Sequence, residues 1–129
     1  MAVAALVTWL ITAVGGFVML GNWIRKGGHR PGSGTRLAPG LVFGHFGLAV
    51  VGLVLWIIYL VARSDGLAWT AFIVLLPVAL LGFTMFFRWL PTRSTASPDS
   101  RFPLAVVLGH GLFAATTLVL VLLTALGVG

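Results

Sequence analysis

The amino-acid sequence predicts an all-α integral membrane protein, a four-helix bundle built from two repeated transmembrane hairpins. Three observations predict this fold class. The chain has 129 residues, of which 60% are hydrophobic and only 8% are charged, whereas about 25% of the residues in a soluble domain are charged. Four apolar stretches reach the roughly 20 residues that a helix needs to cross a hydrocarbon core. Short motifs from the first half also recur about 66 positions later.

We expect one membrane-spanning helix from each apolar stretch. The first is expected at Val3 to Ile24. No basic residue precedes it and it is longer than the apolar core of a signal peptide, so we expect it to be retained. The other helices are expected at Leu41 to Val61, Leu67 to Leu90 and Phe102 to Leu126. Residues 1–129 then form a single transmembrane domain, with one repeat at about 1–62 and the other at about 66–129.

The basic residues predict the orientation of these helices. The first connection, Arg25 to Gly40, is rich in glycine and holds four lysines or arginines, while the middle turn holds only Arg63. The third connection has three basic residues: Arg88, Arg93 and Arg101. Cytoplasmic loops are enriched in Lys and Arg, which predicts a multi-pass protein of the plasma membrane with both termini outside. Trp23 and Trp89, which precede the basic loops, are expected among the lipid headgroups.

Composition also excludes several functions. The chain has no cysteine, which removes disulfides, thiolate metal sites and iron–sulfur clusters. The net charge of +6 does not indicate nucleic-acid binding, because the basic residues flank membrane spans and meet anionic headgroups of the lipid bilayer. Asp65 and Asp99 are predicted on opposite sides of the membrane, so they form no paired-carboxylate site. We expect no catalytic activity from this chain alone.

The internal repeat involves the first helix of each half. Residues 16–24 read GFVMLGNWI and residues 82–90 read GFTMFFRWL. Gly16 and Met19 therefore correspond to Gly82 and Met85, at an offset of 66. Two hairpins related by an axis along the membrane normal are a known repeat symmetry of membrane proteins.

The second helix of each half carries a matching histidine. Gly44-His45 and Gly109-His110 lie 65 positions apart. At a rise of ~1.5 Å per residue, both imidazoles are expected roughly 6 to 12 Å below the cytoplasmic boundary, with Gly16 and Gly82 at a similar depth. An ionisable residue within a membrane indicates a functional site with a partner, and here each histidine is the other's expected partner.

Two neutral imidazoles that face each other can both ligate one metal ion. A bis-histidine haem b meets these requirements, with His45 and His110 as axial ligands and the macrocycle in the space left by Gly16 and Gly82. Its propionates are expected to point toward basic residues at the cytoplasmic helix ends: Arg25, Lys26, Arg88 or Arg93.

This arrangement resembles the four-helix membrane b-type cytochromes, including those of cytochrome b561-like architecture. The resemblance covers the four spans, the histidines of Gly44-His45 and Gly109-His110, and the two glycines. It implies electron transfer. Cytochromes b561 typically hold two haems on opposite sides of the membrane, and this chain has no second histidine pair. The resemblance therefore implies a single haem that exchanges electrons with a quinone or a redox partner subunit, within a homo-oligomer or a larger complex.

Other interpretations remain open from the sequence. Each histidine could bond a backbone carbonyl or a threonine hydroxyl and hold the bundle together, and the glycines could serve close helix packing. Met19 and Met85 could fill gaps in the core, or join the histidines in a copper site. Without a cofactor, the chain would be a membrane scaffold or accessory subunit, or a minimal transporter. His29, in the glycine-rich loop, is expected to be solvated.

Overall fold

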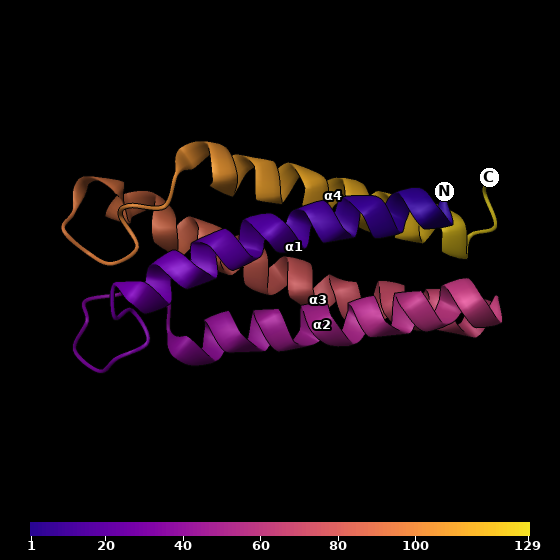
Figure 1. Ribbon diagram of the computed structural model, residues 1–129, viewed down its shortest axis with the longest axis horizontal. Helices are drawn as coiled ribbons and strands as arrows, with labels where there is room; N and C mark the ends of the chain where they lie inside the picture. Colours follow the sequence, from indigo (N-terminus) through magenta and orange to yellow (C-terminus); the bar gives the residue numbers. More distant parts are fainter.

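The structure is a computed structural model that describes all residues from 1 to 129. Four long helices lie side by side and alternate in direction (Figure 1). They are α1 (Ala2–Arg25), α2 (Pro39–Ala62), α3 (Asp65–Trp89) and α4 (Leu104–Ala125), with a short 3-10 helix, η1 (Leu90–Ser94), after α3. Each long helix is long and apolar enough to cross a membrane. The prediction of an all-α chain with four long apolar helices is confirmed.

The helix boundaries lie within about two residues of the predicted ones, and prolines account for two of the differences. Helix α2 begins at Pro39, because proline suits the first turn of a helix, where its missing N–H is not needed. Helix α4 begins at Leu104 and not at Phe102 as predicted. Phe102 precedes Pro103, and the residue before a proline is disfavoured in helical conformation.

The two long connections lie at one end of the bundle, and both termini lie at the other end (Figure 1). Helix α1 packs mainly against α4, and α2 packs mainly against α3. The consecutive helices α1 and α2 meet only sparsely. The closest packing therefore joins the two halves of the chain rather than the two helices of one hairpin.

The core of the bundle lies toward the end that carries the termini. Its buried side chains include Trp9 of α1, Trp56 and Tyr59 of α2, and Leu75 and Val78 of α3. Trp56 is fully buried and donates its indole N–H to the carbonyl oxygen of Ala2 at 3.1 Å, so its polar atom is satisfied.

The two long connections are joined to each other by a buried carboxylate. Asp99 has no exposed surface, and it accepts hydrogen bonds from the Thr35 hydroxyl at 2.6 Å and from the Arg36 backbone N–H at 2.7 Å. We call these three residues the loop clasp. Both bonds cross more than 60 residues of sequence, so the clasp holds the first and third connections together over one end of the bundle.

The prediction that Trp23 and Trp89 lie among lipid headgroups is wrong. Their exposed fractions are only 1% and 2%. Trp23 donates its indole N–H to the Thr35 hydroxyl at 3.0 Å, and Trp89 donates to the Asp99 carbonyl at 2.9 Å. Each connection folds back over the tryptophan that precedes it and supplies the acceptor that a buried indole requires.

Candidate functional site

The histidines of α2 and α4 come together within the helix bundle. His45 projects from α2 and His110 from α4. Their ring centroids are 6.3 Å apart, with an angle of 59° between the ring planes. Both side chains are partly buried. The structure thus places the paired ionisable residues of the sequence next to each other.

Each histidine is oriented by a backbone carbonyl on the helix that packs closest to its own. The Nδ1 atom of His45 lies 2.9 Å from the carbonyl oxygen of Val78 on α3. The Nδ1 atom of His110 lies 2.8 Å from the carbonyl oxygen of Thr12 on α1. A carbonyl oxygen only accepts hydrogen bonds, so in each ring Nδ1 carries the proton. The lone pair of the neutral imidazole is then on Nε2, which bonds no group of this chain.

The two glycines of the repeat contact the histidine rings directly. A Cβ atom added at Gly16 would lie 3.2 Å from Cε1 of His110, and one added at Gly82 would lie 3.3 Å from Cε1 of His45. Both distances are tighter than an ordinary van der Waals contact. The space beside each glycine is therefore taken by the edge of an imidazole ring, which approaches the helix backbone closely because no side chain intervenes. This space is not open for a macrocycle, as the haem interpretation of the sequence expected.

The sequence did not predict the part played by three positions at this site. Thr12 and Val78 act through their backbone carbonyls, so residue type gives no signal for them. Thr12 and Val78 are 66 positions apart, which equals the offset of the glycine motif. Once one of them is known to bond a histidine, this offset identifies the other. Gly15 also contacts His110, since its added Cβ would lie 3.4 Å from the histidine Cβ.

The other residues predicted at the site lie at its margins. Met19 and Met85 are half-buried, three residues closer to the long connections than Gly16 and Gly82. Arg25 and Arg88 are exposed at the helix ends. The Arg25 guanidinium donates to the side chain of Asn22, and Arg88 donates to the Arg36 carbonyl at 3.4 Å.

The expectation that His29 is solvated is wrong. Its ring is half-buried and stands edge-on to Trp23, with 6.3 Å between the ring centroids. Its Nδ1 atom is buried and has no hydrogen-bond partner. The ring is covered because the loop folds back over the end of α1, where Gly28 packs tightly against the Trp23 indole. No group of three or more His, Asp or Glu side chains gathers anywhere in the chain.

The donor set of the histidine pair suits a transition-metal ion, because each neutral ring has its Nε2 lone pair free. A ligating histidine usually donates its other N–H to a carbonyl or a carboxylate, which fixes the ring and its tautomer. Both histidines have this supporting hydrogen bond.

The fold and the site define a four-helix protein with candidate membrane spans and one histidine pair between α2 and α4. No family model matches the chain, and no curated protein or solved structure is detectably similar to it.

Proposed function

We propose that this protein is a membrane electron carrier in which the Nε2 atoms of His45 and His110 hold the iron of a single haem b. The observation that carries the proposal is the matched tautomer of the pair. Both rings donate Nδ1–H to a backbone carbonyl and leave Nε2 without a partner, and their centroids are 6.3 Å apart. A neutral imidazole whose Nε2 lone pair is free can ligate a metal ion.

The proposal includes a pseudo-twofold repeat of two transmembrane hairpins. Matched contacts in the two halves support it. His45 donates to the Val78 carbonyl, and His110 donates to the Thr12 carbonyl. The two histidines are 65 residues apart in the sequence, and the two residues that supply the carbonyls are 66 apart. The glycine contacts correspond in the same way. A repeat of this kind presents two equivalent ligands from opposite sides of an axis along the membrane normal.

The location that we propose is the plasma membrane, with both termini outside. The support is the distribution of charge, because seven of the eight basic residues lie at the end of the bundle with the long connections. Arg25 and Arg88 are exposed at that end and would supply positive charge to the propionates. The histidine pair then lies nearer the cytoplasm.

A haem b held by two histidines supplies a one-electron couple that shuttles between ferric and ferrous iron. His45 and His110 would both be used in holding the iron, so the chemistry that the group would supply is electron transfer. The protein would therefore exchange electrons and would not itself catalyse a substrate reaction. Its partners would be a quinone or a redox subunit on the cytoplasmic side, with the chain acting as a homo-oligomer or within a larger complex.

An absorbance spectrum tests the proposal. The protein is expressed with ample haem supply, purified in detergent, and measured oxidised and then reduced with dithionite, with metal analysis of the same sample. We expect a Soret band, sharp α and β bands on reduction, and one iron per chain. A preparation that is folded by circular dichroism but has no Soret band would exclude the haem. Stoichiometric copper in that preparation would instead indicate a copper site, and the absence of both metals would indicate a scaffold subunit.

A further inference from the structure

A second feature of the molecule lies at the end that carries the two long connections. A hollow of about 440 Å³ opens along the seam where these connections meet. Its lining combines two cations with two serines, an alanine and a proline: Lys26, Ser33, Ala96, Ser97, Pro98 and Arg101. The first connection supplies Lys26 and Ser33, and the third supplies the other four residues. We call this feature the seam hollow. The loop clasp joins the same two connections.

The charge of the seam hollow has no counterpart within the chain. The chain has two acidic residues. The Asp99 carboxylate is buried in the loop clasp, where it is bonded to Thr35 and Arg36, and Asp65 begins α3 at the opposite end of the bundle. Lys26 and Arg101 are both exposed, so their charges remain available to an external anion.

The two serine hydroxyls of the seam hollow differ in how firmly other groups of the chain hold them. The Ser33 hydroxyl donates to the Gly28 carbonyl at 3.1 Å, which fixes the fold of the first connection. The Thr95 hydroxyl gives its one proton to the Thr92 carbonyl at 2.7 Å, so Ser97 is the donor in the longer contact of 3.3 Å between the Ser97 and Thr95 hydroxyls. A hydroxyl proton beside two cations provides the mixture of charge and hydrogen-bond donors that suits phosphate oxygens.

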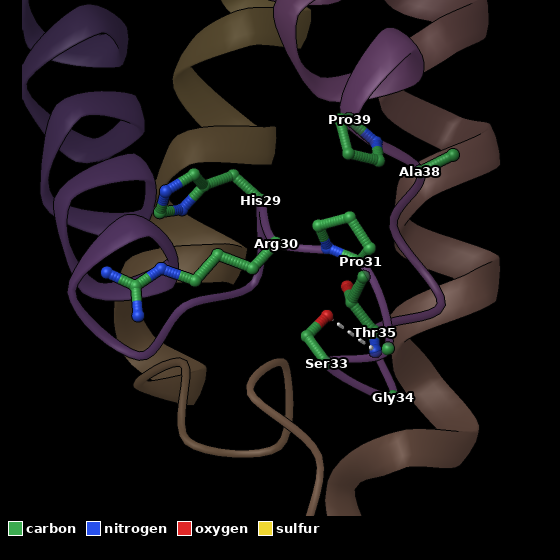
Figure 2. A pocket seen from close by; sticks show the side chains of 9 residues that line it. His29, Arg30, Pro31, Ser33, Gly34, Thr35, Ala38 and Pro39 are labelled. Atoms are coloured by element: carbon green, nitrogen blue, oxygen red, sulfur yellow. Dashed lines mark hydrogen bonds between the residues drawn. The ribbon is translucent and has the colours of Figure 1, made fainter.

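Ser33 also borders a second hollow, of about 410 Å³, which continues the same polar surface along the first connection. Its lining includes His29, Arg30 and Thr35, and Figure 2 shows Ser33 beside Thr35 with the hydrogen bond between them. Gly32 and Gly34 adopt left-handed conformations, with φ of +73° and +77°.

We propose that the seam hollow binds a phosphate-bearing anion, held by Lys26 and Arg101 and by the hydroxyl of Ser97, which would turn from its long contact with Thr95 to a phosphate oxygen. Nothing in this proposal depends on the histidine pair. The phosphate has two conceivable sources, an anionic lipid headgroup and a free phosphate ion. The lysine, the arginine and the hydroxyl would contact phosphate oxygens in the same way in both cases.

Two binding measurements separate these sources. In the first, the whole protein in nonionic detergent is titrated with sodium phosphate by calorimetry. In the second, native mass spectrometry counts the phosphatidylglycerol and phosphatidylcholine molecules that the protein retains. Saturable binding of phosphate without lipid identifies a free-ion site. Retention of one phosphatidylglycerol in preference to phosphatidylcholine, without binding of free phosphate, identifies a lipid headgroup site.

The double variant Lys26→Gln/Arg101→Gln should lower the affinity of the bound species about tenfold or more. Ser97→Ala should lower it severalfold without loss of charge and with little risk to folding. The matched control is Arg36→Gln/Arg93→Gln, which removes two exposed arginines at the same end but outside both hollows. The control should change the affinity less than about threefold.

Two results would overturn the proposal. In the first, the wild-type protein binds phosphate and phosphatidylglycerol no more tightly than the double variant binds them. The second is a control variant that loses as much affinity as Lys26→Gln/Arg101→Gln, since binding would then follow the net charge of this end and not the seam hollow. Helix content measured by circular dichroism establishes that each variant is folded.

Discussion

The Nδ1 atom of His110 donates a hydrogen bond to the backbone carbonyl of Thr12, 2.8 Å away on a neighbouring helix. The orientation of the His110 ring is therefore fixed by the main chain of α1 and not by a side chain. The acceptor therefore persists whatever residue occupies position 12, and the tautomer of His110 follows from the fold itself. His45 is fixed in the same way by Val78, so the packing of α1 on α4 and of α3 on α2 decides where each Nε2 lies.

We expect that His45→Ala and His110→Ala each abolish the proposed haem spectrum or convert it to a five-coordinate form. A single remaining imidazole cannot occupy both axial positions of the iron. His29→Ala serves as the control, because His29 lies in the first connection, packed against Trp23. Spectra of the three purified variants, oxidised and reduced, check this prediction. If either intramembrane variant kept the full wild-type spectrum, that histidine would not be a ligand.

Enlarging the glycines that contact the histidines should disturb the pair. Leucine at position 16 would put its Cβ 3.2 Å from Cε1 of His110, and leucine at position 82 would meet His45 similarly. Such overpacking costs about 1 to 3 kcal/mol, and it displaces a proposed ligand, so Gly16→Leu and Gly82→Leu should both lower stability and haem content.

Gly21→Leu is the matched control for these variants, because it lies on α1 with no atom near its added Cβ. Its effect on stability should be small and favourable, since glycine is the poorer helix former by about 1 kcal/mol. Thermal unfolding in detergent and the haem-to-protein ratio are the measurements. Equal losses in all three variants would mean that contact with the histidines is not the cause.

The orientation in the membrane can be tested without background, because the chain has no cysteine of its own. Ser33→Cys and Ser94→Cys place a thiol in the two long connections, and Ser64→Cys places one in the middle turn. We expect a membrane-impermeant maleimide added to intact cells to label only position 64. Labelling of positions 33 and 94 instead would reverse the proposed topology.

The sequence predicts the helices well because their signal is local. An apolar run of about 20 residues specifies a long helix with little help from the rest of the chain, and prolines such as Pro39 mark where a helix begins. The proximity of His45 and His110 was also predicted, from their matched Gly-His motifs and the similar depth expected for both. The separation of 6.3 Å between their rings and their carbonyl acceptors depend on which helices pack together, which no local pattern encodes.

The loops were harder to predict than the helices, because their hydrogen-bond partners are distant in the sequence. Trp23 and Trp89 have the composition and placement of an aromatic belt, but their indole N–H groups find acceptors in the folded connections. The decisive partner is Asp99, which meets Thr35 across 64 residues of sequence. A lone acid in a basic loop gives no indication that it is buried. Only the folded chain shows that the loop clasp buries the sole acidic side chain of this end.

Removing the central carboxylate should open the loop clasp. Asp99→Ala leaves the Thr35 hydroxyl and the Arg36 N–H without their acceptor, and an unsatisfied buried group costs about 1 to 3 kcal/mol. We expect faster tryptic cleavage after Arg36 and Arg101, by about tenfold or more. Asp65→Asn, at the other end of the bundle, should leave the cleavage rate unchanged. Unaltered cleavage of Asp99→Ala would show that the clasp does not hold the connections together.

A threonine pair gives the two halves of the bundle different interfaces. The Thr117 hydroxyl of α4 lies 2.9 Å from the Thr8 hydroxyl of α1, and Thr117 is only 2% exposed. The repeat offsets place Gly52 and Val74 at the corresponding positions of α2 and α3. There a Cβ added at Gly52 would lie 3.5 Å from Val74 Cγ1, so an apolar contact replaces the hydrogen bond.

Replacing Thr117 by valine keeps the volume of the side chain and removes this interhelical hydrogen bond. Such bonds in membrane proteins contribute about 0.6 kcal/mol on average and about 1.7 at most, so Thr117→Val should lower the free energy of unfolding by an amount in that range. Thr116→Val is the control, because the Thr116 hydroxyl bonds only the Leu112 carbonyl of its own helix. Unfolding is followed by circular dichroism during titration with a denaturing detergent. If the pair interacts as the structure shows, Thr8→Val should add little to the loss in a Thr117→Val background, whereas fully additive losses would mean that the two hydroxyls contribute independently.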